Sequence, residues 1–236
     1  MIRSSMKHYI LVFMAFWNIL FGNATEPVDW ANKARYELEN RELMSQCPDS
    51  NRIVMMGNSI TEYWVELHPG FFTTHHLVGR GISGQVSSQM LARFRQDVIN
   101  LEPRIVIINC GTNDIAENNG PYNEDITMDN IQSMTELALA HGIEVVLTSV
   151  LPCDRFCWNT TVHDVVGKIS RLNERIRGYA STVNPRVHYL NYYPAMTLDG
   201  KSMNHSFTDD GVHPNSRGYD AMEVKLMELL TQLNAR

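Results

Sequence analysis

Short apolar runs alternate with helical patterns along this 236-residue chain, and that alternation constrains its fold more than any other feature. Residues 52–56, 104–109 and 143–148 read as continuous apolar runs, which is typical of strands buried on both faces of a parallel sheet. Residues 76–78 and 187–190 are weaker candidates for two more strands. Strands that alternate with helices predict an α/β fold with about five parallel strands and helices on both faces.

Three stripes of apolar residues at helical spacing separate or follow these runs. One stripe lies within residues 126–139 and ends before Gly142, a residue typical of a helix C-terminus. The others lie within residues 165–176 and 222–233. Residues 30–44 predict an additional helix that packs ahead of the first strand.

Polar, glycine-containing segments follow three of the candidate strands. They are Gly-Asn-Ser-Ile-Thr at 57–61, Gly-Ile-Ser-Gly-Gln at 81–85 and Gly-Thr-Asn-Asp at 111–114. A fourth segment, Asp-Gly-Val-His-Pro, occupies residues 210–214. Because ligands bind beyond the carboxyl ends of the strands in open α/β sheets, we expect the first three segments to meet at one rim.

The residue types in these segments suit nucleophilic catalysis. The Ser59 hydroxyl is a weak nucleophile unless a neighbouring base accepts its proton. Imidazole, with an ordinary pKa of about 6.5, is well matched to that task, which makes His213 the candidate base. Asp210 would then orient the imidazole. Each segment alone is typical of an ordinary turn or loop, but all four in this order favour a hydrolase.

The four segments resemble the sequence blocks of the SGNH (GDSL-type) serine hydrolases, from about residue 52 to the last helix. The resemblance implies that Ser59 is the nucleophile and that Asp210 and His213 are the acid and the base. It also implies that Gly84 and Asn113 donate hydrogen bonds to the oxyanion, together with the backbone N–H of Ser59. The fold that it implies is a flavodoxin-like, three-layer α/β/α sandwich.

The first block departs from the family pattern, because Gly-Asn-Ser stands where Gly-Asp-Ser is usual. Asn58 is not one of the four namesake residues, so the proposed chemistry is unaffected. Two rival classes fit parts of this pattern. An α/β-hydrolase would place a glycine at position 61, where this chain has threonine. A non-catalytic flavodoxin-like binding domain could use residues 57–61 as an anion-binding loop, but it has no need of the Asp-x-x-His spacing.

Composition narrows the choice of partners and cofactors. The net charge of −6 and the lack of a basic stripe argue against nucleic acid. The proposed chemistry needs no metal or organic cofactor, and the cysteines and histidines do not show the spacing of a zinc site. Four cysteines are present; Cys153 and Cys157 are close enough in sequence to form a disulfide, and this possibility is left open. The oligomeric state is also left open.

The N-terminus has the pattern of a secretory signal. Arg3 and Lys7 precede the apolar run at 9–21, and small residues follow it. We therefore predict a signal peptide at 1–24, a single hydrolase domain at 25–236, and a periplasmic or secreted protein with no stable membrane span after cleavage. An uncleaved membrane anchor is the alternative.

The expected reaction is ester hydrolysis through an acyl-serine intermediate. We expect short-acyl (O-acetyl) esters of carbohydrates or related small molecules as substrates, and a lipase or lysophospholipase is the alternative. Phe156 and Trp158 lie on an expected loop, where they would either line the substrate pocket or pack on the scaffold. The segment 204–209 is short and polar, unlike the apolar lid of a lipase.

Overall fold

The computed structural model describes residues 28–47 and 49–234, so the predicted signal peptide lies outside the described residues. All five predicted strand segments form one parallel sheet, with the order β2-β1-β3-β4-β5. The strands are β1 (Ile53–Gly57), β2 (Leu77–Gly81), β3 (Ile105–Ile108), β4 (Glu144–Thr148) and β5 (Val187–Leu190).

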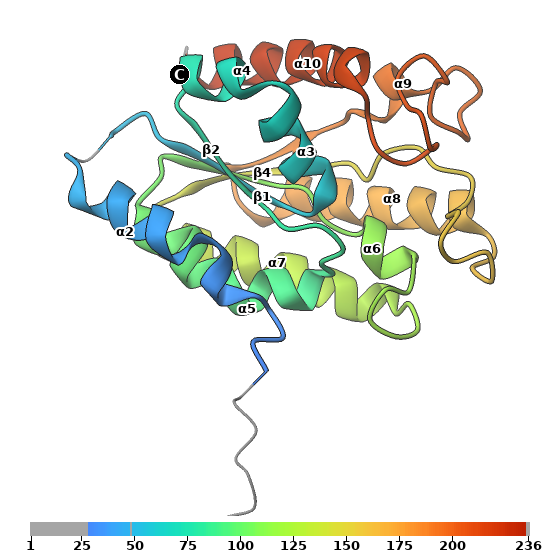
Figure 1. Ribbon diagram of the computed structural model, residues 1–236, viewed down its shortest axis with the longest axis horizontal. Helices are drawn as coiled ribbons and strands as arrows, with labels where there is room; N and C mark the ends of the chain where they lie inside the picture. The colour runs from blue at the N-terminus through green and yellow to red at the C-terminus, as the bar shows by residue number, and fades with distance from the viewer. Residues whose placement is uncertain (1–27, 48, 235–236) are drawn as a thin grey trace, which may run out of the picture. The chain divides into compact units, whose positions relative to one another are not determined.

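Helices cover both faces of this sheet (Figure 1). On one face lie α3 (Ser59–Leu67), α4 (Pro69–Thr74) and α10 (Ser216–Asn234), and on the other lie α5 (Ser87–Asp97), α7 (Glu124–Ala140) and α8 (Val165–Val183). The shorter elements are η1 (Lys33–Tyr36), α2 (Glu37–Ser45), η2 (Ile99–Leu101), α6 (Thr112–Ile115) and α9 (Tyr193–Met196). The predicted α/β/α sandwich with five parallel strands is therefore confirmed.

The pleat of each strand divides the core into two layers. Along β1, Val54 and Met56 pack against one set of helices, whereas Ile53 and Met55 pack against the other set. Successive side chains of a strand point to opposite faces, so a strand covered on both sides must be apolar at every position. This requirement explains the continuous apolar runs in the sequence.

The strand order places the ends of β1, β2 and β3 side by side. The chain runs from β1 outward to β2 and then returns to β3 on the other side of β1. Gly57 lies opposite Gly81, and Met56 lies opposite Ile108. The segments that follow these three strands consequently start at the same edge of the sheet, where this topology opens a crevice for a ligand.

The helix predicted at 30–44 is present as η1 and α2, next to the edge strand β2. The Tyr36 hydroxyl donates a hydrogen bond to the Gly81 carbonyl, and the Tyr36 ring contacts the Arg80 guanidinium at 4.6 Å. Burial raises the pKa of the Tyr36 hydroxyl, so it remains a donor. This helix therefore attaches to the end of β2 that leads into the Gly81–Gly84 turn.

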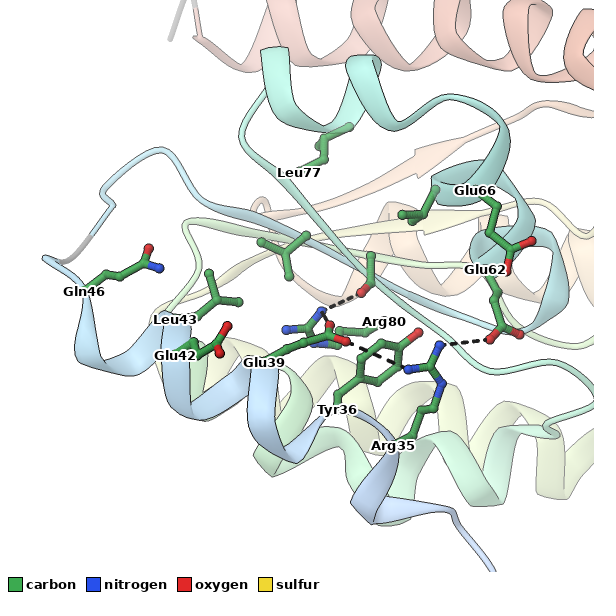
Figure 2. Close-up of a pocket in the computed structure, with 13 residues that line it drawn as sticks. Arg35, Tyr36, Glu39, Glu42, Leu43, Gln46, Glu62, Glu66, Leu77 and Arg80 are labelled. Carbon is green, nitrogen blue, oxygen red and sulfur yellow. Dashed lines mark hydrogen bonds and ion pairs between the residues drawn. The ribbon is translucent and has the colours of Figure 1, made fainter.

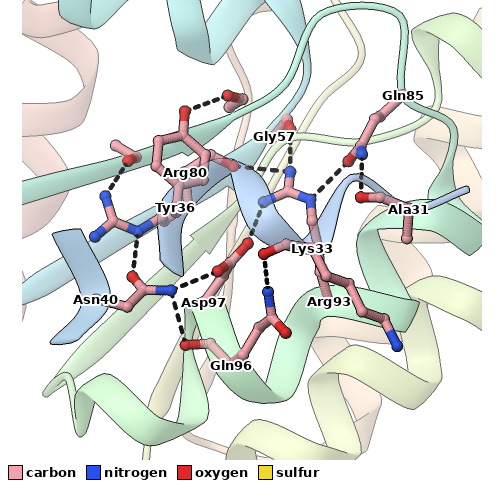
Figure 3. Close-up of polar contacts among 12 residues, drawn as sticks. Ala31, Lys33, Tyr36, Asn40, Gly57, Arg80, Gln85, Arg93, Gln96 and Asp97 are labelled. Atoms are coloured by element: carbon pink, nitrogen blue, oxygen red, sulfur yellow. Dashed lines mark hydrogen bonds and ion pairs between the residues drawn. The ribbon is translucent and has the colours of Figure 1, made fainter. Parts of the chain in front are cut away.

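Arg93 of α5 joins the same region from beneath the sheet (Figure 3). Its guanidinium is fully buried and donates to the carbonyls of Gly57 and Arg80, at 3.0 and 2.9 Å. It also donates to Gln85 Oε1 at 2.6 Å and to Asp97 at 2.8 Å. One side chain thus connects the ends of β1 and β2 with the turn that follows β2.

In the part of the chain that the structure describes, no helix is both long and apolar enough to cross a membrane. All four cysteines are free thiols, so the possible bridge between Cys153 and Cys157 is not formed. The Cys153 thiol is buried and donates to the carbonyl of Arg155.

Candidate active site

Ser59 is the first residue of α3, directly beyond the end of β1. Asn58 caps this helix, because its side-chain oxygen accepts a hydrogen bond from the Ile60 N–H at 3.0 Å. The turn is tight, since a Cβ on Gly81 would lie 2.6 Å from the Asn58 carbonyl oxygen. Glycine at position 81 therefore allows the serine-bearing turn to sit against the neighbouring strand.

The structure brings Ser59, His213 and Asp210 together although the serine and the histidine are 154 residues apart. Ser59 Oγ lies 2.9 Å from His213 Nε2, and His213 Nδ1 lies 2.6 Å from Asp210 Oδ2. A carboxylate only accepts, so Nδ1 carries the proton and donates to Asp210. Nε2 is then an acceptor for the serine hydroxyl, as a general base must be.

Local hydrogen bonds shape the Asp-x-x-His segment. The other carboxylate oxygen of Asp210 accepts from the backbone N–H groups of Val212 and His213, both at 2.8 Å, and from the Thr208 hydroxyl. Burial raises the pKa of the Asp210 carboxyl, but the hydrogen bonds from His213 and Val212 outweigh that effect and lower the pKa below its ordinary value. Asp210 therefore stays ionised at pH values where an ordinary aspartate begins to take up a proton.

The Gly81–Gly84 turn carries the predicted oxyanion donor Gly84 and is tied to α3. The Ile82 N–H donates to the Gly57 carbonyl at 3.2 Å, and Ser83 donates to Glu62 Oε2 through its N–H at 2.8 Å and its hydroxyl at 2.5 Å. Gly84 has a φ of +78°, which favours glycine. Within the described residues, its own N–H has no protein acceptor.

The side chain of Asn113 is buried at the start of α6 and bonded to two neighbours. Its Nδ2 donates to the Gln85 carbonyl at 3.0 Å, and its Oδ1 accepts from Asn118 Nδ2 at 3.0 Å. One N–H of the amide has no partner among the described residues. The structure therefore places Asn113 beside the turn that carries Gly84, with one donor still free.

The following residue, Asp114, serves this framework rather than the reaction. It accepts from the N–H and the hydroxyl of Ser87, the first residue of α5, and from the Thr127 hydroxyl. Burial raises the pKa of Asp114, although these hydrogen bonds oppose that effect. The Gly-Thr-Asn-Asp segment is thus fixed to the helix that follows the Gly84 turn.

The two aromatic residues predicted near the substrate have different positions. Phe156 is 1% exposed and packs in the core, so it does not line the site, in contrast to one of the two expectations. Trp158 is 44% exposed, and its ring centroid lies 6.1 Å from that of His213. The difference arises because Phe156 points into the buried apolar cluster, whereas Trp158 is exposed on the same loop beside His213.

Tyr63 flanks His213 as well, with ring centroids 5.3 Å apart, and sequence reasoning did not single it out. It lies four residues after Ser59 on α3, and positions i and i+4 share one face of a helix. That spacing is the signal that would have found it. Tyr63 and Trp158 together give the site two exposed aromatic walls.

Another polar cluster, formed by His68, Asp220 and Glu223, has donor atoms within 4.8 Å of one another. His68 Nδ1 contacts Glu223 at 2.6 Å, and Nε2 contacts the Ser216 hydroxyl at 2.7 Å. Both ring nitrogens thus have protein partners. These contacts link the end of α3 to α10, which is a structural role.

A hollow of about 400 Å³ lies between α2, α3 and β2 (Figure 2). Its described lining residues include no serine, cysteine or histidine, so it offers no nucleophile or imidazole base. Arg35 spans it, with ion-pair distances of 3.5 Å to Glu62 and 3.9 Å to Glu39. Through Glu62, this hollow borders the turn that carries Gly84.

Comparisons with known proteins identify the family of the chain. The GDSL-like Lipase/Acylhydrolase family matches residues 55–221. A GDSL-like lipase of Bacteroides thetaiotaomicron is 50% identical, with a TM-score of 0.82, and the match covers 86% of this chain and 98% of that one. A candidate acylhydrolase of Bacteroides fragilis is 49% identical, with the same TM-score and coverage.

The chain therefore belongs to the GDSL-like lipase/acylhydrolase family, and it is an ester hydrolase. An acetyl xylan esterase shares the fold at 19% identity, with a TM-score of 0.62 and coverage of 75% of this chain and 98% of that one. No curated protein matched the sequence.

Proposed function

We propose that this protein is a serine esterase that removes short acyl groups, acetyl above all, from carbohydrates or related small molecules. The observation that carries the proposal is the continuous hydrogen-bonded series from Ser59 Oγ through His213 to Asp210. A non-catalytic binding domain would not require these hydrogen bonds between a serine, a histidine and an aspartate. Ser59, His213 and Asp210 are accordingly assigned as nucleophile, base and orienting acid.

The reaction proceeds in two acyl transfers. Ser59 Oγ attacks the ester carbonyl carbon while His213 Nε2 takes the hydroxyl proton. The C–O bond to the alcohol then breaks, and the imidazolium returns the proton to that leaving oxygen. His213 Nε2 then takes a proton from water as the water oxygen attacks the acyl carbon. The bond from that carbon to Ser59 Oγ breaks, the imidazolium returns the proton to Ser59 Oγ, and the carboxylic acid leaves.

The negative charge of each tetrahedral intermediate requires donors that are already in place. We assign this task to the backbone N–H groups of Ser59 and Gly84 and to the free N–H of Asn113. The first two have no acceptor among the described residues, which suits a waiting donor. The Ser59 N–H also lies at the N-terminus of α3, where the helix dipole favours negative charge.

The carbohydrate part of the proposal is supported by the exposed rings of Tyr63 and Trp158. Aromatic side chains provide large, rigid apolar surface, and the apolar faces of sugar rings fit against such surface. Acetyl xylan esterase activity on the same fold is consistent with this assignment. A lipase or lysophospholipase is the alternative outcome of the tests below.

The decisive experiment is hydrolysis of nitrophenyl acetate by the protein and by Ser59→Ala. We expect the variant to lose at least about a thousand-fold in kcat, because removing a member of such a triad leaves only the oxyanion donors and substrate binding. Ser181→Ala, which changes an exposed serine on α8 whose hydroxyl donates to the Gly178 carbonyl, is the matched control for serine removal and should keep full, Ser59-dependent activity. Undiminished turnover by folded Ser59→Ala would reject the mechanism.

The substrate class is tested with acetylated xylo-oligosaccharides and with Trp158→Ala. The expected result is release of acetate, with a higher KM for the oligosaccharide in the variant and a smaller change for nitrophenyl acetate. Equal changes for both substrates would show that Trp158 does not contact the sugar.

A further inference from the structure

Asn118 makes side-chain contacts with three residues around the proposed oxyanion site. It lies in the loop between α6 and α7. Its Nδ2 is 3.0 Å from Asn113 Oδ1 and 3.4 Å from the Gly84 carbonyl oxygen, and its Oδ1 accepts from Trp158 Nε1 at 2.9 Å. A single exposed amide therefore connects two predicted oxyanion donors with an aromatic wall of the site.

Trp158 determines which way this amide faces. The indole N–H can donate but cannot accept, so the oxygen of the Asn118 amide must point toward Trp158. The nitrogen then points toward Asn113 and Gly84, where both neighbouring atoms are oxygens. All the contacts of Asn118 agree with this one orientation and disagree with the flipped one.

The same reasoning continues to Asn113. Because Asn118 presents N–H groups, Asn113 must turn its oxygen toward Asn118 and its nitrogen toward the Gln85 carbonyl. One N–H of Asn113 then remains for the oxyanion. If the Asn113 amide were flipped, its oxygen would take the place of that donor and would repel a developing negative charge.

Asn118 also restrains the turn that carries Gly84. Glycine can adopt many conformations besides the left-handed one, and a Cβ added to Gly84 would have no other heavy atom within 4 Å, so packing around this position does not confine it. The bond from Asn118 to the Gly84 carbonyl holds the turn on one side, and Glu62 holds Ser83 on the other.

We propose that Asn118 is a positioning residue of the reaction, which sets the orientation of the Asn113 amide and restrains Gly84. The orientation of the Asn118 amide is in turn fixed by Trp158. This inference rests on the proposed function, because it assigns the oxyanion to Gly84 and Asn113. Asn118 itself does not touch the reacting atoms.

The first test compares Asn118→Ala and Asn118→Asp with the control Asn119→Ala, which changes an exposed asparagine in the same loop. We expect kcat for nitrophenyl acetate to fall about tenfold or more in Asn118→Ala with KM nearly unchanged, since removing an oxyanion donor outright costs about a hundred- to a thousand-fold. Asn118→Asp should lose at least as much, because a carboxylate still accepts from Trp158 but offers no donor to Asn113. Asn119→Ala should behave as the unaltered protein.

The second test separates positioning from general support of the fold. If Asn118 acts through Asn113, Asn118→Ala should cause a much smaller further loss of kcat in an Asn113→Ala background than in the unaltered protein. The same factor in both backgrounds would overturn the inference. Thermal unfolding of each variant ensures that only folded protein is compared.

Trp158→Phe supplies a third arm, since it keeps the ring and removes the N–H. We expect a several-fold loss of kcat that is absent when Asn118 is already alanine. Ser59→Ala, assayed in parallel, distinguishes failure of the proposed function from failure of the proposed role of Asn118. Undiminished activity in Ser59→Ala rejects the proposed function, whereas Ser59-dependent activity with unaltered kcat in Asn118→Ala rejects the role of Asn118 alone.

Discussion

At the scale of single residues, the two oxygens of Asp210 have different tasks. One shapes the Asp-x-x-His turn by accepting backbone N–H groups, and the other holds His213 Nδ1. The three-residue spacing follows from this geometry, because only a short turn lets one carboxylate reach both the backbone and the ring of the histidine. The acid and the base are therefore positioned together as one local unit.

This arrangement predicts the pH dependence of the reaction. The lowered pKa of Asp210 keeps its carboxylate ionised at pH values where an ordinary aspartate begins to take up a proton. Only a neutral imidazole can accept the proton of Ser59. We therefore expect log kcat/KM to fall toward acid pH in a way that fits the uptake of one proton, the one that inactivates His213. Rates across the acid range, measured with protein shown to remain folded, test this. A two-proton acid limb would show that Asp210 titrates together with His213.

The departure of Asn58 from the family pattern gives a second prediction. Its amide oxygen caps α3 through the Ile60 N–H, and aspartate caps helices about as well as asparagine. We expect Asn58→Asp to keep turnover within a few-fold, with the helix N-terminus offsetting the added buried charge. Asn58→Ala should lower the free energy of unfolding by about 1 kcal/mol. Urea unfolding and nitrophenyl acetate hydrolysis measure both, and equal destabilisation by the two changes would contradict the capping role.

At the scale of elements, the predicted strands and apolar helices agree with the structure, because burial on both faces of the sheet leaves a strong pattern in the sequence. Trp158, for which the sequence allowed two positions, and Tyr63, which it did not single out, illustrate what such patterns leave undetermined. Their places beside His213 depend on how a loop and a helix face pack on the finished sheet, and so do the contacts of Arg93 and Asn118. Polar side chains that bond across dozens of residues leave no local periodicity to read.

Arg93 provides a prediction about the contacts that hold the ends of β1 and β2 to α5. Removing its guanidinium leaves Asp97 buried with Asn40 as its remaining side-chain partner, and it deprives the Gly57 carbonyl of a donor. Breaking a buried ion pair typically costs about 3–5 kcal/mol, and we expect Arg93→Met to lose stability on that scale in urea unfolding. Arg95→Met, an exposed change on the same helix, should remain within about 0.5 kcal/mol. Similar losses for both variants would show that the buried network contributes little.

At the scale of the whole molecule, a rigid parallel sheet carries the reacting groups on segments that each begin at its carboxyl edge. Ser59 follows β1, Gly84 follows β2 and Asn113 follows β3, while Asp210 and His213 precede α10. Each of these segments is also bonded to a neighbour. This mutual support suits a reaction that depends on donors held in place before charge develops.

The surroundings of this edge lead to a prediction about acyl length. A long acyl chain needs apolar surface in order to leave water, at about 0.8 kcal/mol for each buried CH₂. Beside His213 the structure offers two separate exposed rings, Tyr63 and Trp158. The nearby segment 204–209 has one apolar side chain, Phe207, which packs against the core. Within this segment, Asn204 Oδ1 accepts hydrogen bonds from the N–H and the hydroxyl of Ser206.

Added methylenes should therefore gain little binding energy at this site. We expect kcat/KM to be highest for acetyl and to decline through butyryl, octanoyl and palmitoyl nitrophenyl esters, assayed below the concentrations at which they aggregate. Ser59→Ala, included at each chain length, removes any background hydrolysis from the comparison. A steady rise toward palmitoyl would overturn the short-acyl assignment and favour a lipase, because it would mean that the molecule buries the chain on apolar surface that these two rings alone do not provide.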